Sequence, residues 1–221
     1  MTLRTAATTV ASAADFIPPR PTLAKLREAA QHCRGCHLWM HATQTVFGEG
    51  PTSAEVMLVG EQPGDLEDRA AHPFVGPAGK LLDTSLTRAG IDRTRVYVTN
   101  SVKHFKFVTI ERGRRLHKKP SAAEVRACNP WLQEEIRLIK PRVIVALGAT
   151  AAQALLGKQF RVTQDRGKPM ASDLAEAVIA TVHPSAVLRA PDHRRDEARQ
   201  EFIADLKQVA AYLNRAPSGR A

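Results

Sequence analysis

Short apolar runs alternate with stretches of helical periodicity along this chain. Residues 56–59 (Val-Met-Leu-Val) are four consecutive apolar residues, two of them β-branched, which is the pattern of a strand buried on both faces. Strands that alternate with helices form a mainly parallel sheet with helices on both sides. The pattern therefore predicts an α/β fold, a three-layer α/β/α sandwich around a central, mainly parallel four-stranded sheet. The strands are predicted at residues 56–59, 96–99, 143–147 and 178–182.

Helix start and stop signals lie between these runs. Pro77 opens a predicted helix that Gly90 ends. Ser121 and Glu124 form a capping box, which predicts a second helix extending to about Ile139. Further helices are expected at residues 23–33, from residues 148–150 onward, and near the end of the chain, where Phe202, Leu206, Val209 and Leu213 recur at helical spacing.

Length and composition fit one globular domain. With 221 residues, 43% of them hydrophobic, the chain can bury a sizeable core. No apolar run approaches a membrane span and no signal-peptide core is visible, so we expect a cytoplasmic protein without a membrane partner. The predicted organisation is a single domain at residues 21–215, with a disordered leader at 1–20 and a disordered tail at 216–221.

Polar residues follow directly on three of the predicted strands. The turn at residues 60–64 (Gly-Glu-Gln-Pro-Gly) follows the first strand, Asn100 follows the second, and His183 follows the fourth. In open α/β sheets ligands bind beyond the carboxyl ends of the strands, so these segments are expected to meet in one cleft. The alternative is an ordinary strand-ending turn and a structural histidine, the commoner role of a histidine taken alone.

The charge of the chain favours a polyanionic partner. The formal net charge is +10 and the pI is about 10.0, and clustered Lys and Arg gain free energy by releasing counterions from nucleic acid. Much of the excess lies in residues 103–119, the basic insertion, which holds seven basic side chains against the single acid Glu111. The alternative for this insertion is a solvated loop that only aids solubility.

Four segments in fixed order carry a resemblance to a known family. They are residues 60–64, 73–79 (Pro-Phe-Val-Gly-Pro-Ala-Gly), 99–103 (Thr-Asn-Ser-Val-Lys) and 183–189 (His-Pro-Ser-Ala-Val-Leu-Arg). Together they resemble the motifs of the uracil-DNA glycosylase superfamily, closest to its family 4 branch and the UdgX subgroup, over roughly residues 30–213.

Two features resemble the UdgX subgroup in particular. One is Gln62, where ordinary family 4 enzymes tend to have a small residue, and the other is the end of the basic insertion, which resembles the subgroup's Lys-Arg-Arg-Ile-His loop. The chain departs from that loop at two positions, with Gly113 for Lys and Leu116 for Ile, while His117 is in place. These departures leave the seating of the loop open.

The resemblance implies a site that removes uracil from DNA. Phe74 would stack on the flipped uracil, Asn100 would read its O4/N3 edge, and His183 would stabilise negative charge at O2. Glu61 would act as general base or as electrostatic partner of the sugar cation, and Gln62 would orient sugar or base. The DNA contacts expected from the resemblance and the charge are Arg114, Arg115, Lys103, Lys118, Ser185 and Arg189.

UdgX proteins become covalently attached to DNA, and the resemblance carries this role to His117. An imidazole held near the sugar cation can capture C1′ before water does, and Arg114 and Arg115 would brace the loop that holds it. Without the resemblance, a histidine in a basic loop is more often a phosphate contact. A conventional family 4 enzyme that turns over and a non-catalytic iron–sulfur DNA-binding module remain alternatives. The expected partner is uracil-containing DNA, preferably single-stranded, bound by a monomer that needs no protein partner.

The cysteines form a candidate metal site. Cys33 and Cys36 have metal-knuckle spacing, Cys128 is the third thiol, and an odd count argues against a disulfide scaffold. Family 4 proteins bind a [4Fe–4S] cluster through four cysteines, and His104 stands here at the position of the third. The resemblance therefore implies a [4Fe–4S] cluster held structurally by three cysteines and His104, because imidazole can replace thiolate on iron. Zinc suits the same ligands, and ordinary metal-free thiols are the other alternative.

Overall fold

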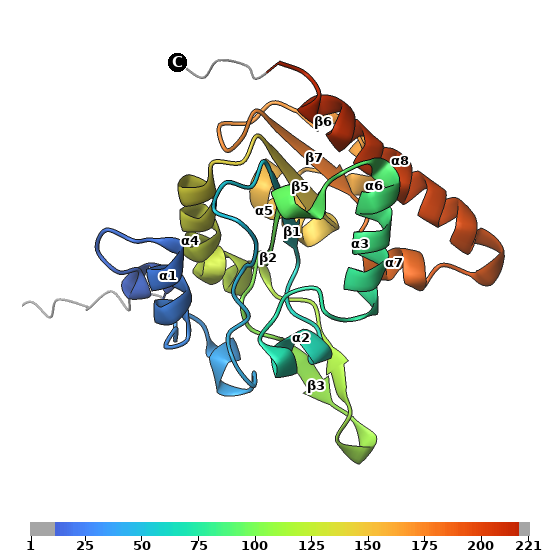
Figure 1. Ribbon diagram of the computed structural model, residues 1–221. Helices are drawn as coiled ribbons and strands as arrows, with labels where there is room; N and C mark the ends of the chain where they lie inside the picture. The colour runs from blue at the N-terminus through green and yellow to red at the C-terminus, as the bar shows by residue number, and fades with distance from the viewer. Residues whose placement is uncertain (1–11, 217–221) are drawn as a thin grey trace, which may run out of the picture.

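The computed structural model describes residues 12–216, which are built around a five-stranded sheet of order β2-β1-β5-β7-β6 (Figure 1). Four strands run parallel, namely β1 (Val56–Gly60), β2 (Val96–Asn100), β5 (Val143–Leu147) and β7 (Ala177–Thr181). Every residue in these strands is buried, as expected of near-continuous apolar runs in a parallel sheet. The α/β fold class and the four parallel strands are confirmed.

A short edge strand was missed. Strand β6 (Pro169–Met170) pairs antiparallel with β7, so the predicted four-stranded sheet has five strands. Two residues show no alternation of polar and apolar positions, and proline lacks the N–H that an inner strand must donate. The sequence pattern therefore gives no signal for this strand, and its place at the edge is the one that proline tolerates.

The predicted helix signals agree with the structure at several boundaries. Helix α3 (Pro77–Ala89) has Pro77 in its first turn and ends at Gly90, whose φ is 78°. Helix α4 (Ala122–Ile139) has the predicted capping box at Ser121. The remaining helices are α1 (Leu23–Ala30), α2 (Asp65–Ala70), α5 (Ala149–Leu156), α6 (Val162–Asp165), α7 (Pro184–Leu188) and α8 (Arg195–Leu213), with short 3-10 turns η1 (Ala13–Phe16), η2 (His37–Met40), η3 (Arg93–Arg95), η4 (Glu111–Gly113) and η5 (Asp192–Arg194).

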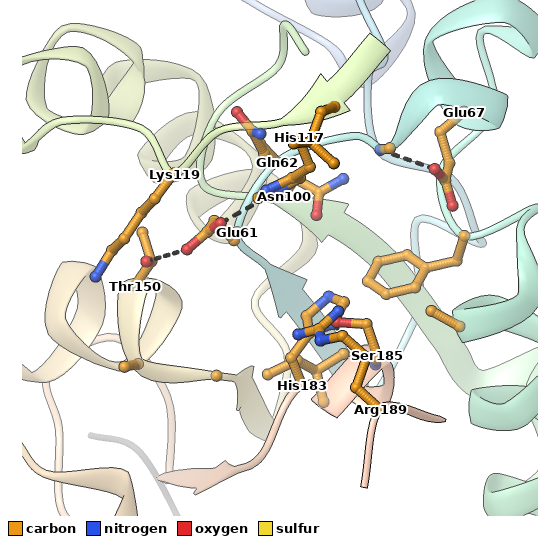
Figure 2. Close-up of a pocket in the computed structure, with 17 residues that line it drawn as sticks. Glu61, Gln62, Glu67, Asn100, His117, Lys119, Thr150, His183, Ser185 and Arg189 are labelled. Atoms are coloured by element: carbon orange, nitrogen blue, oxygen red, sulfur yellow. Dashed lines mark hydrogen bonds and ion pairs between the residues drawn. The ribbon is translucent and has the colours of Figure 1, made fainter. Parts of the chain in front are cut away.

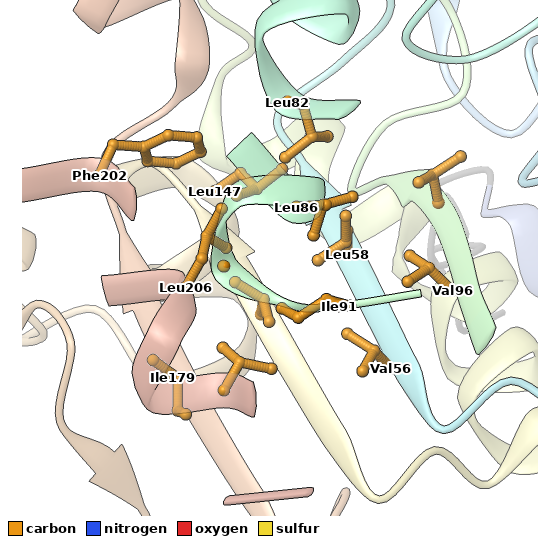
Figure 3. Packing of buried hydrophobic residues seen from close by; sticks show 14 of the residues in the cluster. Val56, Leu58, Leu82, Leu86, Ile91, Val96, Leu147, Ile179, Phe202 and Leu206 are labelled. Carbon is orange, nitrogen blue, oxygen red and sulfur yellow. The ribbon is translucent and has the colours of Figure 1, made fainter. Parts of the chain in front are cut away.

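The helices form a layer on each face of the sheet. Alternate residues of a strand point to opposite faces, so Val56 and Leu58 of β1 join the core cluster with α3 and α8, which Figure 3 shows. Met57 and Val59 of the same strand join the cluster beneath α4 and α5. The two layers together bury β1 from both sides and fix the position of its carboxyl end.

The N-terminal segment packs on the domain from residue 12 onward. Ser12 caps η1, and Ala13 is fully buried in a third core cluster beside α1 and α4. The predicted disordered leader at 1–20 is therefore wrong for residues 12–20, because this segment contributes apolar surface to the core. Residues 1–11 lie outside the described residues, as does the predicted tail apart from residue 216.

The basic insertion forms a two-stranded hairpin. Strands β3 (Phe107–Thr109) and β4 (Arg115–His117) pair antiparallel, with Phe107 opposite His117, and η4 lies at the tip. Most of its residues are exposed, and it projects from the bottom of the view in Figure 1. Among the described residues, no helix is long and apolar enough to cross a membrane.

Candidate active site

A cleft of about 510 Å³ lies at the carboxyl ends of the parallel strands (Figure 2). Glu61 follows β1, Asn100 ends β2 and His183 follows β7, and all three line the cleft. The predicted convergence of these strand ends is therefore observed. The lining residues that give the cleft its chemistry are Glu61, Gln62, Glu67, Phe74, Asn100, His117, Lys119, Thr150, His183, Ser185 and Arg189.

The Glu61 carboxylate faces two different partners. Its Oε2 accepts a hydrogen bond from the Thr150 hydroxyl at the start of α5. Its Oε1 lies 3.3 Å from Nε2 of His117 on β4, and the His117 side chain is 47% exposed against 21% for Glu61. The Glu61 carboxylate is thus hydrogen-bonded to helix α5 on one side and lies close to the β3–β4 hairpin on the other.

His183 presents one ring nitrogen to the cleft in a defined protonation state. The backbone N–H of Ser185 donates to Nδ1 at 3.2 Å, and the Ser185 hydroxyl lies 2.8 Å from the same nitrogen. Because Nδ1 accepts, the proton of the neutral ring is on Nε2. Burial, with smaller contributions from the charges of Arg189 and His117, lowers the pKa of His183 to about 4. At neutral pH the ring is therefore an uncharged hydrogen-bond donor.

Phe74 and Asn100 define the part of the cleft that would hold a flat base. The Phe74 ring stacks near His183 with centroids 6.2 Å apart and an interplanar angle of 25°. Phe74 has a φ of 59°, unusual for a residue with a side chain, and a Cβ at Gly79 would overlap its carbonyl oxygen. A Cβ at Gly60 would likewise overlap the Asn100 amide oxygen. Phe74 and Asn100 can therefore occupy these positions only with glycine at positions 79 and 60.

The hairpin is fastened to the rest of the site by polar side chains. Arg115 pairs with Asp65 and with Asp68, the latter through Nη1 and Oδ2 at 2.6 Å, and donates to the Thr43 hydroxyl at 2.9 Å. Its guanidinium also lies 4.9 Å from the Phe107 ring centroid. The prediction that Arg115 braces the insertion agrees with this arrangement. The predicted phosphate contact of Arg115 stays a prediction, and its side chain, 11% exposed, already faces two carboxylates.

Comparison with known proteins agrees with the resemblance that these motifs carry. A profile described as the Uracil DNA glycosylase superfamily matches residues 47–207. The chain belongs to the uracil-DNA glycosylase superfamily. The type-4 uracil-DNA glycosylase of Thermotoga maritima is 36% identical over 189 residues, covering 85% of this chain and 93% of the relative. That of Pyrobaculum aerophilum is 39% identical over 191 residues, covering 83% and 91%. The solved structure of Pedobacter heparinus SMUG2 aligns with a TM-score of 0.48 at 14% identity, over 72% of this chain and 77% of that one.

In this member of the uracil-DNA glycosylase superfamily, Gln62 lines the cleft and also contacts the hairpin. Its amide nitrogen donates to the carbonyl oxygens of Lys106 at 3.1 Å and Lys118 at 3.2 Å, and its oxygen accepts from the Lys106 N–H at 3.1 Å. Lys106 and Lys118, which flank the hairpin and form its two roots, are thus hydrogen-bonded to the turn after β1. Both amide protons are engaged with the hairpin, so Gln62 positions it, and the predicted role of orienting sugar or base stays a prediction.

Lys103 was assigned wrongly as a DNA contact. It is fully buried, and its Nζ lies 2.6 Å from Oε2 of Glu135 and donates to the Thr99 hydroxyl and the Asn100 carbonyl. The Tyr97 hydroxyl also donates to Glu135 at 2.9 Å. A count of charges along the sequence could not reveal this, because it does not distinguish a lysine in a buried ion pair from one in an exposed basic patch. Of the other expected DNA contacts, Arg114 and Lys118 are exposed, and Ser185 and Arg189 line the cleft.

Three residues of the cleft were not singled out from the sequence. Thr150 holds Glu61, Lys119 lines the cleft beside the hairpin, and Glu67 accepts hydrogen bonds from the N–H groups of Gly64 and Gly76. The only signal for Thr150 was its place at a predicted helix start directly after a strand. The other two carry no such signal in a single sequence.

The three cysteines of the candidate metal site belong to the third core cluster or pack against it. Cys33 and Cys128 are buried, and Cys36 is partly buried beside them. The Trp131 indole N–H donates to the Cys33 sulfur at 3.3 Å, and the Lys103 backbone N–H donates to the Cys128 sulfur at 3.2 Å. Burial raises the pKa of the Cys128 thiol to about 12. N–H groups directed at sulfur suit a thiolate that binds iron, so the donor chemistry fits a cluster.

The fourth candidate ligand has a different partner. Nε2 of His104 lies 2.9 Å from the Thr45 hydroxyl, and burial lowers the pKa of His104 to about 4, so the ring is neutral. Cys33 and His104 line a common cavity of about 170 Å³. Within residues 12–216, no group of three or more His, Cys, Asp or Glu side chains could hold a metal ion as placed. The predicted cluster is therefore not confirmed by geometry.

Proposed function

We propose that the protein excises uracil from DNA and that His117 then bonds covalently to C1′ of the resulting sugar. The observation that carries the second part is the placement of His117, whose Nε2 lies 3.3 Å from the Glu61 carboxylate at the cleft. Family membership and the type-4 relatives support the excision itself. The UdgX-like features, Gln62 and His117, are joined in the structure by the hairpin that both contact or form part of.

Excision requires negative charge on the leaving base and positive charge near C1′ to be stabilised together. Neutral His183 would donate from Nε2 to the developing oxyanion, and Asn100 would read the edge of the flipped base against the Phe74 ring. The Glu61 carboxylate, fixed by Thr150, would face the sugar cation. The C1′–N1 bond breaks with its electron pair moving onto uracil.

Capture then follows from the position of the imidazole. The lone pair of a ring nitrogen of His117 forms a bond to C1′, and the ring becomes positively charged. It loses the proton on its other nitrogen, for which Glu61 is a neighbouring acceptor, and the uracil anion gains a proton. In net terms one C–N bond replaces another, one proton moves from imidazole to uracil, and no water is consumed.

We also propose that Cys33, Cys36, Cys128 and His104 hold a [4Fe–4S] cluster, with zinc as the alternative. The gathering of three thiols in one buried cluster and the two N–H groups directed at sulfur support it. Such a group would fasten the N-terminal segment to α4 and both ends of the basic insertion, and it takes no part in the chemical step. Visible absorbance with iron and sulfide analysis tests this, and iron-free, zinc-loaded protein purified under nitrogen would contradict it.

The test of covalent capture separates three outcomes in one assay. Protein is incubated with uracil-containing DNA, in single-stranded and duplex form, and both a denaturing gel and uracil release are measured. A denaturant-resistant band at the size of protein plus DNA supports capture, free abasic product without the band supports ordinary turnover, and neither supports a binding module. A stronger band with the single strand would support the proposed strand preference.

The matched variants are His117→Ala and His193→Ala. His193 is a histidine in η5 that does not line the cleft, so its removal controls for loss of an imidazole from a basic surface. We expect His117→Ala to lose the band while still releasing uracil, and His193→Ala to behave as wild type. A band of full yield in His117→Ala would remove His117 as the captured nucleophile.

A further inference from the structure

An exposed tryptophan stands outside the cleft. The chain has two tryptophans, and Trp131 is fully buried, whereas Trp39 in η2 is 37% exposed and its neighbour Met40 is 55% exposed. The Arg34 guanidinium lies 4.8 Å from the centroid of the Trp39 ring. A large aromatic ring beside a cation at the surface is the composition of a platform on which a nucleic-acid base can stack.

The charge around Trp39 suits a polyanion. Residues 29–48, between Glu28 and Glu49, contain no Asp or Glu, and the basic side chains there are Arg34 and three histidines. The nearby carboxylates are already paired: Glu124 with Lys106 and with His37, and Asp68 with Arg115. A phosphate backbone that approaches η2 therefore meets no uncompensated negative charge from these groups.

Residues 37–43, which include η2, are connected by hydrogen bonds to the hairpin that carries His117. The Thr43 N–H donates to the Asp68 carboxylate at 3.0 Å, and Arg115 of β4 donates to the Thr43 hydroxyl at 2.9 Å. Trp39 and Thr43 line the same cavity of about 170 Å³. In Figure 1 the segment after α1 lies beside α2, on the side of the molecule from which the β3–β4 hairpin projects.

We infer that Trp39, backed by Arg34, stacks an unpaired base of the same DNA strand whose uracil occupies the cleft. The Arg115–Thr43 hydrogen bond links the hairpin at the cleft to the segment that carries Trp39, so we place the strand that leaves the cleft along this connection. The site takes a single strand because bases in a duplex are already stacked on their neighbours and offer no free face. The inference depends on binding of DNA in the cleft and not on covalent capture by His117.

The test uses uracil-free single-stranded oligonucleotides of two kinds, so that neither excision nor capture intervenes. Short ones cover only the cleft, and long ones are extended on the 5′ side, the 3′ side or both. We expect Trp39→Ala to weaken binding of one extended oligonucleotide by about 5- to 100-fold, the range for loss of one base–aromatic stack, and to leave the short one unchanged. Trp39→Phe should retain most of the affinity, and Met40→Ala, which removes an exposed apolar neighbour, should bind as wild type.

Two further measurements decide whether the loss of affinity in Trp39→Ala comes from Trp39 itself. Tryptophan emission of the wild type should change on binding the extended oligonucleotide and not the short one, and this change should be absent in Trp39→Phe, where only Trp131 remains. Uracil release from a short substrate should be the same in every variant. Unchanged affinity of Trp39→Ala for all extended oligonucleotides would overturn the proposal, leaving a protein partner as the explanation of the exposed ring. An equal loss on short and extended oligonucleotides would also overturn it, as a purely structural effect.

Discussion

The strand-end rim and the β3–β4 hairpin supply two walls of one cleft and are held in place by different forces. The rim residues Glu61, Asn100 and His183 each follow or end a strand whose every residue is buried. The hairpin consists of two three-residue strands that pair with each other and are mostly exposed. The rim is positioned by apolar burial on both faces of a sheet, and the hairpin by side-chain hydrogen bonds and ion pairs.

Because different forces hold them, the two walls can be altered separately. The groups proposed to break the glycosidic bond lie on the rim, whereas the proposed nucleophile lies on the hairpin. Changes to the rim should therefore reduce excision and capture together, while changes that loosen the hairpin should reduce capture alone. The following variants test this division.

Replacing Glu61 by Gln should have the largest effect, because it removes the charge shared by both walls. The amide keeps the shape and can still accept from Thr150, so the change is electrostatic. We expect uracil release to fall by about 10²- to 10⁴-fold, the usual contribution of a positioned acid–base group, and the covalent band to fall with it. Single-turnover uracil release measures this. Unchanged release with loss of the band alone would move Glu61 from the rim chemistry to capture only.

Lys103→Met tests the buried part of the rim. The change leaves the fully buried Glu135 carboxylate without its cation, which should destabilise the fold by about 3–5 kcal/mol. Lys118→Met is the matched control, since Lys118 is exposed and its loss should cost less than about 0.5 kcal/mol. Denaturant midpoints measure the stability, and the salt dependence of DNA binding measures phosphate contacts. Lys118→Met should lower the salt slope by about one contact and Lys103→Met should not; the reverse would restore Lys103 as a DNA ligand.

Stability should depend on pH through His183, because its surroundings in the cleft disfavour the charged form of the ring. The folded pKa of His183, about 4, lies below the unfolded value of about 6.5, so the unfolded chain binds a proton first as pH falls. Stability should therefore decrease from about pH 6.5 to about pH 4, by at most about 3.4 kcal/mol from this residue. Denaturant unfolding above and below this window, in wild type and in His183→Asn, should show the decrease shrinking in the variant. Identical pH profiles would contradict a neutral, buried His183.

Gln62→Ala should have the smallest effect and the most selective one. Losing the hydrogen bonds to Lys106 and Lys118 should lower the ratio of covalent product to released uracil by about 10-fold, with little change in release. Gln44→Ala is the control, because Gln44 also binds two backbone carbonyls, those of Asp68 and Arg69, but does not contact the hairpin roots. Quantified gels and uracil release give the ratio. An equal fall in both products would support the substrate-orienting role predicted for Gln62 from the sequence.

The sequence predicted the rim well and the hairpin poorly for a physical reason. Buried parallel strands are written as continuous apolar runs, and the polar residues that follow them must meet at one edge, so the places of Glu61, Asn100 and His183 could be predicted. The hairpin strands are three residues long and exposed, and therefore lack any such run. Its contacts depend on which side chains meet across the fold, which a single sequence does not record.

The contacts missed at individual residues share this cause. Arg115 and Lys103 were both counted as free cations for DNA, yet each has carboxylate partners far away in the chain. Gln62 was assigned to the substrate because its partners on the hairpin could not be foreseen. The prediction that residues 12–20 are disordered failed because a few apolar residues, such as Ala13, suffice to seat a short segment on a core already formed by α1 and α4.

The left-handed backbone of Phe74 has a consequence for how this cleft can evolve. Any side chain at Gly79 would overlap the Phe74 carbonyl, so the observed backbone at Phe74 requires glycine at position 79. A lineage that acquires a larger residue at position 79 must rebuild the turn, and with it the ring proposed to stack on the base. Position 79 is thus a marker that can be read in sequences alone, and a relative lacking glycine there is one in which to look for a changed base preference.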